Sequence, residues 1–352
     1  VYLFDRASAG GSLLDAIHFG LQTTGFSVSR LPVLSATWNL SVPSPGAANL
    51  AAGLGSVTSL RVNEWMADPV VGDDWFEIFN TGDLPISLGG LVFTDDLADK
   101  NHAPVAPLSF VGARQHGFRQ FFASGNSGKD QVDFALKKTG ESLGLFTASG
   151  VLLDGVQFGL QQTGVSQGLF PDGADFITNF VSTASPSFSN YLPIQGIFIN
   201  EILAHTELPL EDAIELANET GFDVNVGGWF LSNSRDDYKK FRIPDGTMVK
   251  ARGYLVFYEN QFKNGAVPFT LNSAFDGSVH LSQTDPLGNL TGRRQDLFFG
   301  PTPNGLSVGR HRKSNGIDFV AQTFRTFGQD NPESIDQFRQ GRGAANSHPK
   351  VG

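Results

Sequence analysis

The chain has 352 residues, 31 Phe, 41 Gly, no Cys and a formal net charge of −10. The lack of cysteine excludes disulfide bonds and thiolate metal sites. The negative charge argues against a nucleic-acid partner, which requires a basic stripe, and no apolar run has the length of a membrane span. Aromatic and β-branched runs between Gly, Pro, Asn and Asp are typical of strands and turns, so we expect packed β units.

A fourteen-residue segment occurs twice. Residues 14–27 read LDAIHFGLQTTGFS and residues 153–166 read LDGVQFGLQQTGVS, with nine identical positions. The identical positions include Asp15 and Asp154, and Gly20 and Gly159. A repeat of this length predicts an array of domain-sized units. We therefore expect a polar side chain found in every copy to be structural, and one found in a single copy to be a candidate for function.

The front half of the unit repeats as well. Asn63, Glu64, Glu77 and Asn80 correspond in order to Asn200, Glu201, Glu215 and Asn218. The middle copy ends on Ser-Pro-x-x-x-Asn at residues 185–190, and residues 326–331 are a weak echo of it. The resulting division is a truncated rear half at 1–52, whole units at 57–192 and 196–335, and a linker at 336–352. Residues 51–59 and 191–196 are predicted to be short linkers, and we expect the chain to be a piece of a longer protein.

The strand pattern follows from Gly turns and short apolar runs. We expect core strands at residues 118–123 and 253–258, and strands at 143–146 and 279–282 before polar tips. Residues 152–159 are predicted to return as the second strand of a hairpin. Strands with turn signals about every 8–12 residues predict a sandwich or barrel.

The order of these motifs resembles the lamin tail domain. The motifs are [V/I]-N-E, E-[I/L]-x-N, [L/V]-G-G-[L/W], G-Y-L-V, L-D-x-[I/V]-x-F-G and S-P-x-x-x-N. The resemblance implies an all-β chain of tandem immunoglobulin-like β-sandwiches. It is closer to the bacterial arrangement than to a nuclear lamin, because tandem copies occur without heptads. It therefore implies an extracellular or cell-surface location. The middle copy departs from the pattern at Leu91, where the last copy has the expected Trp229.

The shared Asn-Glu pairs and the later glutamates are the best polar candidates. Two neighbouring carboxylates could act as an acid–base pair or hold a cation. They could instead bond loop amides and close one end of the sandwich, as buried polar groups nearly always do. Because Glu64, Glu77 and their counterparts recur in both whole copies, we favour the structural role and predict no catalytic, cofactor or metal residue.

Other motifs give weaker signals. Acidic doublets begin at Asp73, Asp95 and Asp236, outside any calcium-loop frame. The seven histidines lack zinc-ligand spacing. Gly-x-Ser-x-Gly occurs around Ser166 and Ser307 without a following helical pattern, so we interpret both as turns. The basic clusters at residues 293–294 and 310–313 are interpreted as solvated turns.

We therefore predict a non-enzymatic array that acts as a spacer and as a weak multivalent binding surface. Its expected partners are a protein or surface polymer and further domains of the same polypeptide, with no membrane insertion. The loops that differ most between copies are residues 95–107, 124–133, 232–241 and 259–268. One alternative is an accessory role beside an exported nuclease, esterase or phosphatase. Another is a carbohydrate-binding module, which would need exposed tryptophans among Trp38, Trp65, Trp75 and Trp229.

Overall fold

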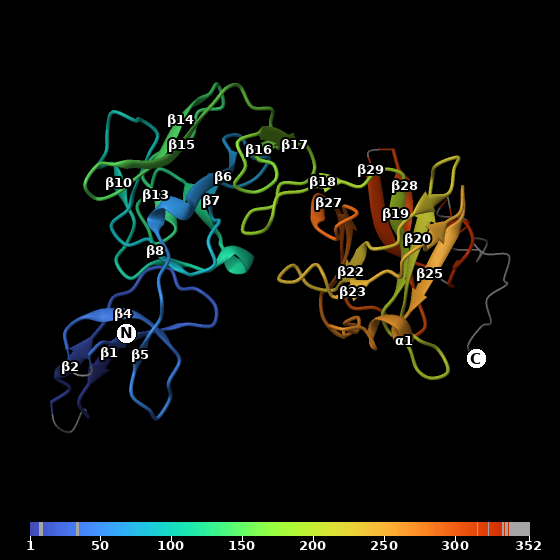
Figure 1. Cartoon of the computed structure of the whole chain (residues 1–352), viewed down its shortest axis with the longest axis horizontal. Coiled ribbons are helices and arrows are strands. Elements are labelled where there is room, and N and C mark those ends of the chain that lie inside the picture. Colours follow the sequence, from blue (N-terminus) through green and yellow to red (C-terminus); the bar gives the residue numbers. More distant parts are fainter. Residues whose placement is uncertain are drawn as a thin grey trace. The chain divides into compact units, whose positions relative to one another are not determined.

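The computed structural model describes residues 1–6, 10–32, 35–314, 316–322, 324–332, 334 and 337 (Figure 1). The chain forms two compact units, Val1–Tyr191 (unit 1) and Leu192–Gly352 (unit 2). The predicted linker at 336–352 lies outside the described residues except for Gln337. The predicted boundaries at 1–52, 57–192 and 196–335 stay predictions. Among the described residues, no helix has the length and apolarity needed to cross a membrane.

Unit 1 begins with two small sheets. The hairpin is β1 (Tyr2–Phe4) with β2 (Leu13–Ala16), and the second sheet is β3 (Ser27–Arg30), β4 (Trp38–Val42) and β5 (Leu50–Ala51). The segment between these sheets lies against the rest of unit 1. The Gly20 amide donates to the Pro107 carbonyl at 3.0 Å, and the Phe110 amide donates to the Leu21 carbonyl at 2.8 Å. Leu21 also packs on the central core, so residues 20–21 anchor the front of the chain.

The rest of unit 1 is a sandwich of two main sheets. One sheet has the order β13 (Gln131–Val132), β12 (Phe118–Ala123), β7 (Asp74–Asn80), β6 (Leu60–Met66), β16 (Ser166–Leu169), β17 (Ile177–Phe180). The facing sheet has the order β10 (Ala103–Pro104), β9 (Val92–Thr94), β14 (Glu141–Phe146), β15 (Leu152–Phe158). A small sheet pairs β8 (Ile86–Ser87) with β11 (Phe110–Val111), and the short helices η2 (Val57–Ser59) and η3 (Arg114–His116) lie in connections.

The core of this sandwich is aromatic. Phe76 of β7 stacks on Phe121 of β12 with ring centroids 5.6 Å apart, and meets Phe93 of the facing sheet at 4.8 Å. All three rings are buried, and Leu143 joins them from β14. Burying such rings is the main contribution to stability in a sandwich of this size.

Unit 2 repeats the arrangement. One sheet has the order β25 (Tyr254–Tyr258), β20 (Ala213–Asn218), β19 (Ile197–Leu203), β28 (Val308–Lys313), β29 (Gly316–Ala321). The other has the order β18 (Leu192–Pro193), β27 (Leu290–Phe299), β26 (Gly277–Thr284), β22 (Phe230–Ser232), β23 (Phe241–Arg242). β21 (Val224–Asn225) pairs with β24 (Met248–Val249), and α1 (Glu259–Phe262) is a single turn. The all-β, immunoglobulin-like sandwich prediction is confirmed, and the strands expected at 118–123, 143–146, 152–159, 253–258 and 279–282 are present.

Residues of both predicted linkers take part in the folded units, and the boundary between the two units falls at Tyr191–Leu192, inside the second predicted linker. In the segment 191–196, Leu192 and Pro193 pair in parallel with β27, and Ile194 is 2% exposed in the core. In the segment 51–59, Ala51 ends β5 and the Gly55 amide donates to the Pro85 carbonyl at 2.8 Å. An apolar residue beside Pro can supply a sheet edge, where the missing Pro N–H costs nothing.

Candidate functional site

The shared Asn-Glu pairs lie at β-bulges. The register between β6 and β7 shifts between Val62 and Glu64, and the register between β19 and β20 shifts between Ile199 and Glu201. The residue at each shift is the asparagine, Asn63 or Asn200. A bulge inserts one extra residue and re-aims its side chain. This explains how two consecutive polar residues of one strand, Asn63 and Glu64, can both be fully buried.

In unit 1 the two glutamates bind the loop that follows β17. Glu64 accepts hydrogen bonds from the Ser185 amide at 3.1 Å and from the Ser166 hydroxyl at 2.5 Å. Glu77 accepts one from the Ser187 amide and one from Asn63 Nδ2, the latter at 3.2 Å. The glutamates thereby fasten the closing loop to the centre of the sheet.

The asparagines complete the same cluster. Asn63 Nδ2 also donates to Asp172 at 3.0 Å, and Asn63 Oδ1 accepts from the Gly173 amide at 3.0 Å. Asn190, the last residue of the Ser-Pro-x-x-x-Asn motif, donates to the carbonyls of Asn63 and Leu169 at 3.2 and 2.9 Å. The motif therefore closes the sandwich onto the bulge.

Unit 2 contains the same cluster with different loop residues. Glu201 accepts from the Thr326 amide at 2.9 Å and from the Thr326 hydroxyl at 2.5 Å. Glu215 accepts from the Gly328 amide at 2.5 Å and from Asn200 Nδ2 at 2.8 Å. Thr326 thus takes the place of Ser185. The segment 326–331, which matches the Ser-Pro-x-x-x-Asn motif only weakly, therefore makes the same contacts as the full motif.

One backbone position shows how closely the two clusters correspond. The amide that reaches the second glutamate belongs to Ser187 in unit 1 and to Gly328 in unit 2. Both residues have a left-handed backbone conformation, with φ of 70° for Ser187 and 79° for Gly328. Glycine adopts this conformation without strain, whereas serine does not. The strain accepted at Ser187 indicates that the contact with Glu77 holds the loop in place.

Burial perturbs the pKa values of all four glutamates. It raises the pKa of Glu64 to about 7 and that of Glu215 to about 8. Burial, helped by the charge of Glu64, raises the pKa of Glu77 well above its ordinary value, and burial also raises the pKa of Glu201. The cause is desolvation, which disfavours the charged form of a carboxyl group. The side chains of all four glutamates are fully buried.

The second shared asparagine, Asn80 or Asn218, holds a turn in each unit through two hydrogen bonds. Asn80 Nδ2 donates to the carbonyls of Leu84 and Gly112 at 2.8 and 2.7 Å. Asn218 Nδ2 donates to the carbonyls of Phe222 and Val249 at 2.8 and 3.0 Å. Each asparagine therefore joins two chain segments at one end of its sandwich.

The aspartates of the long repeat bridge strands. Asp154 accepts a hydrogen bond from the Val62 amide at 2.7 Å, across the two sheets of unit 1. In unit 2 Gln295 accepts the same bond from the Ile199 amide at 2.9 Å, so the role survives a change of residue. Asp15, the front counterpart, pairs instead with Arg30 at 2.6 Å near the surface.

The two repeated glycines have different surroundings, which gives a testable contrast. A Cβ at Gly20 would lie 2.0 Å from Ser109 Oγ and 3.2 Å from the Pro107 carbonyl oxygen, whereas a Cβ at Gly159 would meet nothing within 4 Å. Gly20→Ala should therefore weaken the docking of residues 20–21 by about 1–3 kcal/mol, the usual cost of overpacking. The measurement is amide hydrogen exchange at Phe110, with Gly159→Ala as the matched control. Equal exchange in the two variants would contradict this account.

Several weaker candidates are also placed by the structure. Ser166 starts β16 and is buried against Glu64, with a strand and not a helix after it, and Ser307 is buried before β28. Asp95 faces His102 at 3.2 Å. In the described part of the chain no group of three or more His, Asp or Glu residues could hold a metal ion. Trp65, Trp75 and Trp229 are 0%, 6% and 6% exposed, so these three offer no platform to a sugar.

The interpretation of the basic clusters as turns is wrong, since both lie in strands, although Arg293, Arg312 and Lys313 are exposed as expected. Residues 293–294 lie in β27, where Arg294 is 4% exposed and donates to Asp296 at 2.7 Å. Residues 310–313 lie in β28, and the Arg310 side chain is 9% exposed. Arg310 is covered because it pairs with Glu219 and lies 4.0 Å from the Phe198 ring centroid.

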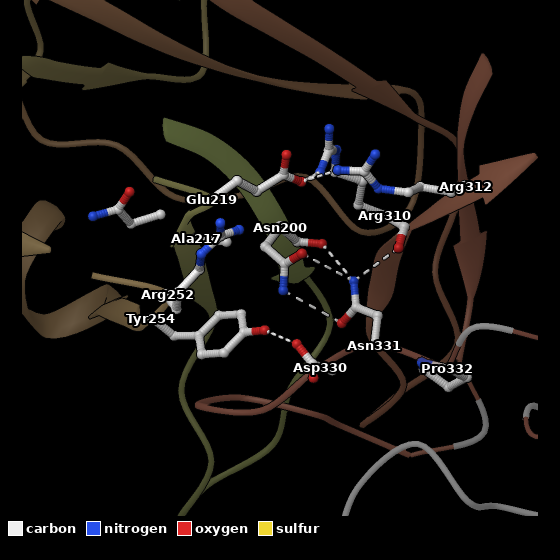
Figure 2. A pocket seen from close by; sticks show the side chains of 11 residues that line it. Asn200, Ala217, Glu219, Arg252, Tyr254, Arg310, Arg312, Asp330, Asn331 and Pro332 are labelled. Carbon is white, nitrogen blue, oxygen red and sulfur yellow. Dashed lines mark hydrogen bonds and ion pairs between the residues drawn. The ribbon is translucent and has the colours of Figure 1, made fainter. Parts of the chain in front are cut away.

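Arg310 also lines a cavity of about 580 Å³ in unit 2. Figure 2 shows Tyr254 and Asp330 at one side of it and Glu219 with Arg310 and Arg312 at the other. The pair Asn200 and Asn331 lies between them. The sequence pointed to this region, because the basic cluster at 310–313 occurs in the last copy only. The cavity itself was not predictable, because its lining residues are distant in sequence.

The structural role of the loop residues was not visible in the sequence alone. Asp172, Ser187 and Gly328 carry no motif of their own, yet each contacts a shared Asn or Glu. The spacing of more than 100 residues between partners hides these pairs from any local pattern.

The comparisons with known proteins agree with the fold. Searches of curated proteins and of solved structures gave no match. The matched segment in the family comparison runs from β18 into β27 and so covers most strands of unit 2. Residues 193–295 match the family described as the Lamin Tail Domain.

Proposed function

We propose that this chain is a non-catalytic array of lamin-tail-like sandwiches in a large secreted or cell-surface bacterial protein. The array acts as a spacer and as a surface for weak, multivalent contacts with a protein or surface polymer. The observation that carries the proposal is the use of the shared carboxyl groups. Glu64, Glu77 and their counterparts hold loop amides inside the fold, where a substrate cannot reach them.

The differences between copies support a surface role. The groups that recur are buried and hydrogen-bonded, while the connections at the sandwich ends vary in length and sequence. Residues 95–107 and 232–241 are the clearest pair, because each follows the corresponding strand, β9 or β22. Binding residues are commonly found on loops held by a rigid scaffold. We therefore propose these loops as the contact surface.

Stretching the full chain from its two ends tests the spacer role. Each sandwich has its own core, so the two should unfold in separate steps under force. Each step should lengthen the chain by roughly 450 Å, since an extended residue spans about 3.3–3.6 Å. A single concerted step would contradict the proposal. Hydrolysis of a phosphate or carboxylic ester by the purified chain would instead favour a catalytic role.

A further inference from the structure

The cavity in unit 2 lies where unit 1 has packed rings. In unit 1 Phe79 pairs with Phe118 across β7 and β12, and the two rings stack with centroids 4.4 Å apart. The equivalent register pair in unit 2 is Ala217 with Tyr254. Both residues line the cavity of about 580 Å³. The exchange of Phe for Ala removes a ring from the face of the sheet and so leaves space above Ala217.

The residues around this space also change from apolar to charged. Leu169 follows Gly168, the partner of Glu64, whereas Arg310 follows Gly309, the partner of Glu201. Arg310 and Arg312 both donate to the same oxygen of Glu219, the latter at 2.5 Å. One carboxylate oxygen thus accepts from two guanidinium groups, so other N–H groups of these arginines remain available to a ligand.

The charge balance of the lining is positive. Three arginines and two carboxylates line the cavity, which gives a formal charge of +1 (3 − 2), against −10 for the whole chain. The carboxylates are already engaged, because Glu219 holds two arginines and Asp330 accepts the Tyr254 hydroxyl. Burial and the charge of Asp330 raise the pKa of Tyr254, so its hydroxyl stays protonated.

Arg252 is the donor that is free to bind. Among the described residues its guanidinium has no hydrogen-bond or ion-pair partner. Its backbone is left-handed, with φ of 56°, and its amide donates to the Thr220 carbonyl at 3.1 Å. A left-handed non-glycine residue costs about 1–3 kcal/mol, and such strain is often found at ligand sites. By contrast, the amides of Asn200 and Asn331 are satisfied by each other and by backbone carbonyls.

We propose that this cavity binds a small organic anion about the size of a monosaccharide. Its carboxylate or phosphate group lies between Arg252 and Arg312, and its body lies against Tyr254 in the space above Ala217. The forked guanidinium donors match the oxygens of either anion, and small-molecule sites commonly span about 300–1,000 Å³. The inference is independent of the spacer role, since the site is complete within unit 2.

Isothermal titration calorimetry on the full chain tests this proposal with three probes. Glucuronate and inorganic phosphate carry the two anionic groups, and glucose has the sugar body without the charge. We expect saturable binding of glucuronate, inorganic phosphate or both, and none of glucose. Binding of glucuronate alone assigns a carboxylate ligand, and binding of phosphate alone assigns a phosphorylated one. If neither anion binds at concentrations up to about 10 mM, or if glucose binds equally well, the proposal is overturned.

Two variants locate the binding. Arg252→Gly removes the free guanidinium and relieves the left-handed strain, so the unit should stay folded while affinity falls at least about tenfold. Ala217→Phe restores the ring found at Phe79 and should abolish binding by filling the space. Arg114→Ala is the charge-matched control, because that side chain is 62% exposed in unit 1. Unchanged affinity in Arg252→Gly, or an equal loss in Arg114→Ala, would overturn the assignment.

Discussion

Replacing Glu64 with Ala should lower the free energy of unfolding of unit 1 by about 3–5 kcal/mol, because each buried donor left without an acceptor costs about 1–3 kcal/mol. The change leaves the Ser185 amide and the Ser166 hydroxyl without their acceptor, while the Ser185 hydroxyl keeps Asn190 Oδ1 at 3.1 Å. Glu64→Gln should cost less than half as much, since it keeps one acceptor oxygen and nearly the same shape. The larger change also leaves a cavity between the sheet and the closing loop at Ser185.

Urea denaturation followed by tryptophan fluorescence measures this difference. A Trp229→Phe background removes the tryptophan of unit 2, so that Trp38, Trp65 and Trp75 report on unit 1. Asp83→Ala is the control, because its side chain is 92% exposed and its removal should be nearly neutral. If Glu64→Ala unfolds at the wild-type urea concentration, the carboxyl does not hold the loop.

The stability of unit 2 should fall as pH rises from 5 to 8, which is the second large effect. Glu215 has a pKa of about 8 in the folded chain, raised by burial from 4.5. Between these values the folded state keeps a proton that the unfolded chain releases, so the free energy of unfolding decreases with pH. Glu215 alone contributes at most about 1.4 kcal/mol per pH unit, or about 4 kcal/mol over the range.

The control for this effect is Glu215→Gln, which carries no titrating group and should flatten the slope. Glu201 and Asp212, whose pKa values are raised by burial, contribute with the same sign. The lowered pKa of Asp296 acts with the opposite sign, but only below 3.8 and hence outside this range. Urea unfolding at four pH values, followed by the fluorescence difference between the wild type and Trp229→Phe, gives the slope. Stability that stays level or rises in the wild type would show that the glutamates are charged in the folded state.

The strands were predictable because they rest on local chemistry. Gly253 and Gly117 precede strands rich in aromatic residues, and the repeat doubled the signal. The recurrence of Glu64 and Glu77 in both whole copies likewise indicated a structural role. The burial of Ile194, within one predicted linker, was not predictable because it depends on the distant strand β27.

Side-chain partners were less predictable than strands. Arg310 follows a glycine in a basic run and resembles a turn residue, yet Phe198 and Glu219 cover it. Phe79 corresponds to Ala217, a single difference between two apolar residues, and its consequence appears only when Tyr254 and the arginines lie around it. Such features arise from contacts between residues far apart in the chain, which no local pattern records.

Amide hydrogen exchange of the full chain tests the central claim most directly. If the shared glutamates are structural acceptors, the loop amides of Ser185, Ser187, Thr326 and Gly328 should be as protected as the core strands and exchange only by unfolding of the sandwich. Fast exchange of these four amides in a chain whose β6 and β19 amides remain protected would contradict the account, because the carboxyl groups would then be free for other partners.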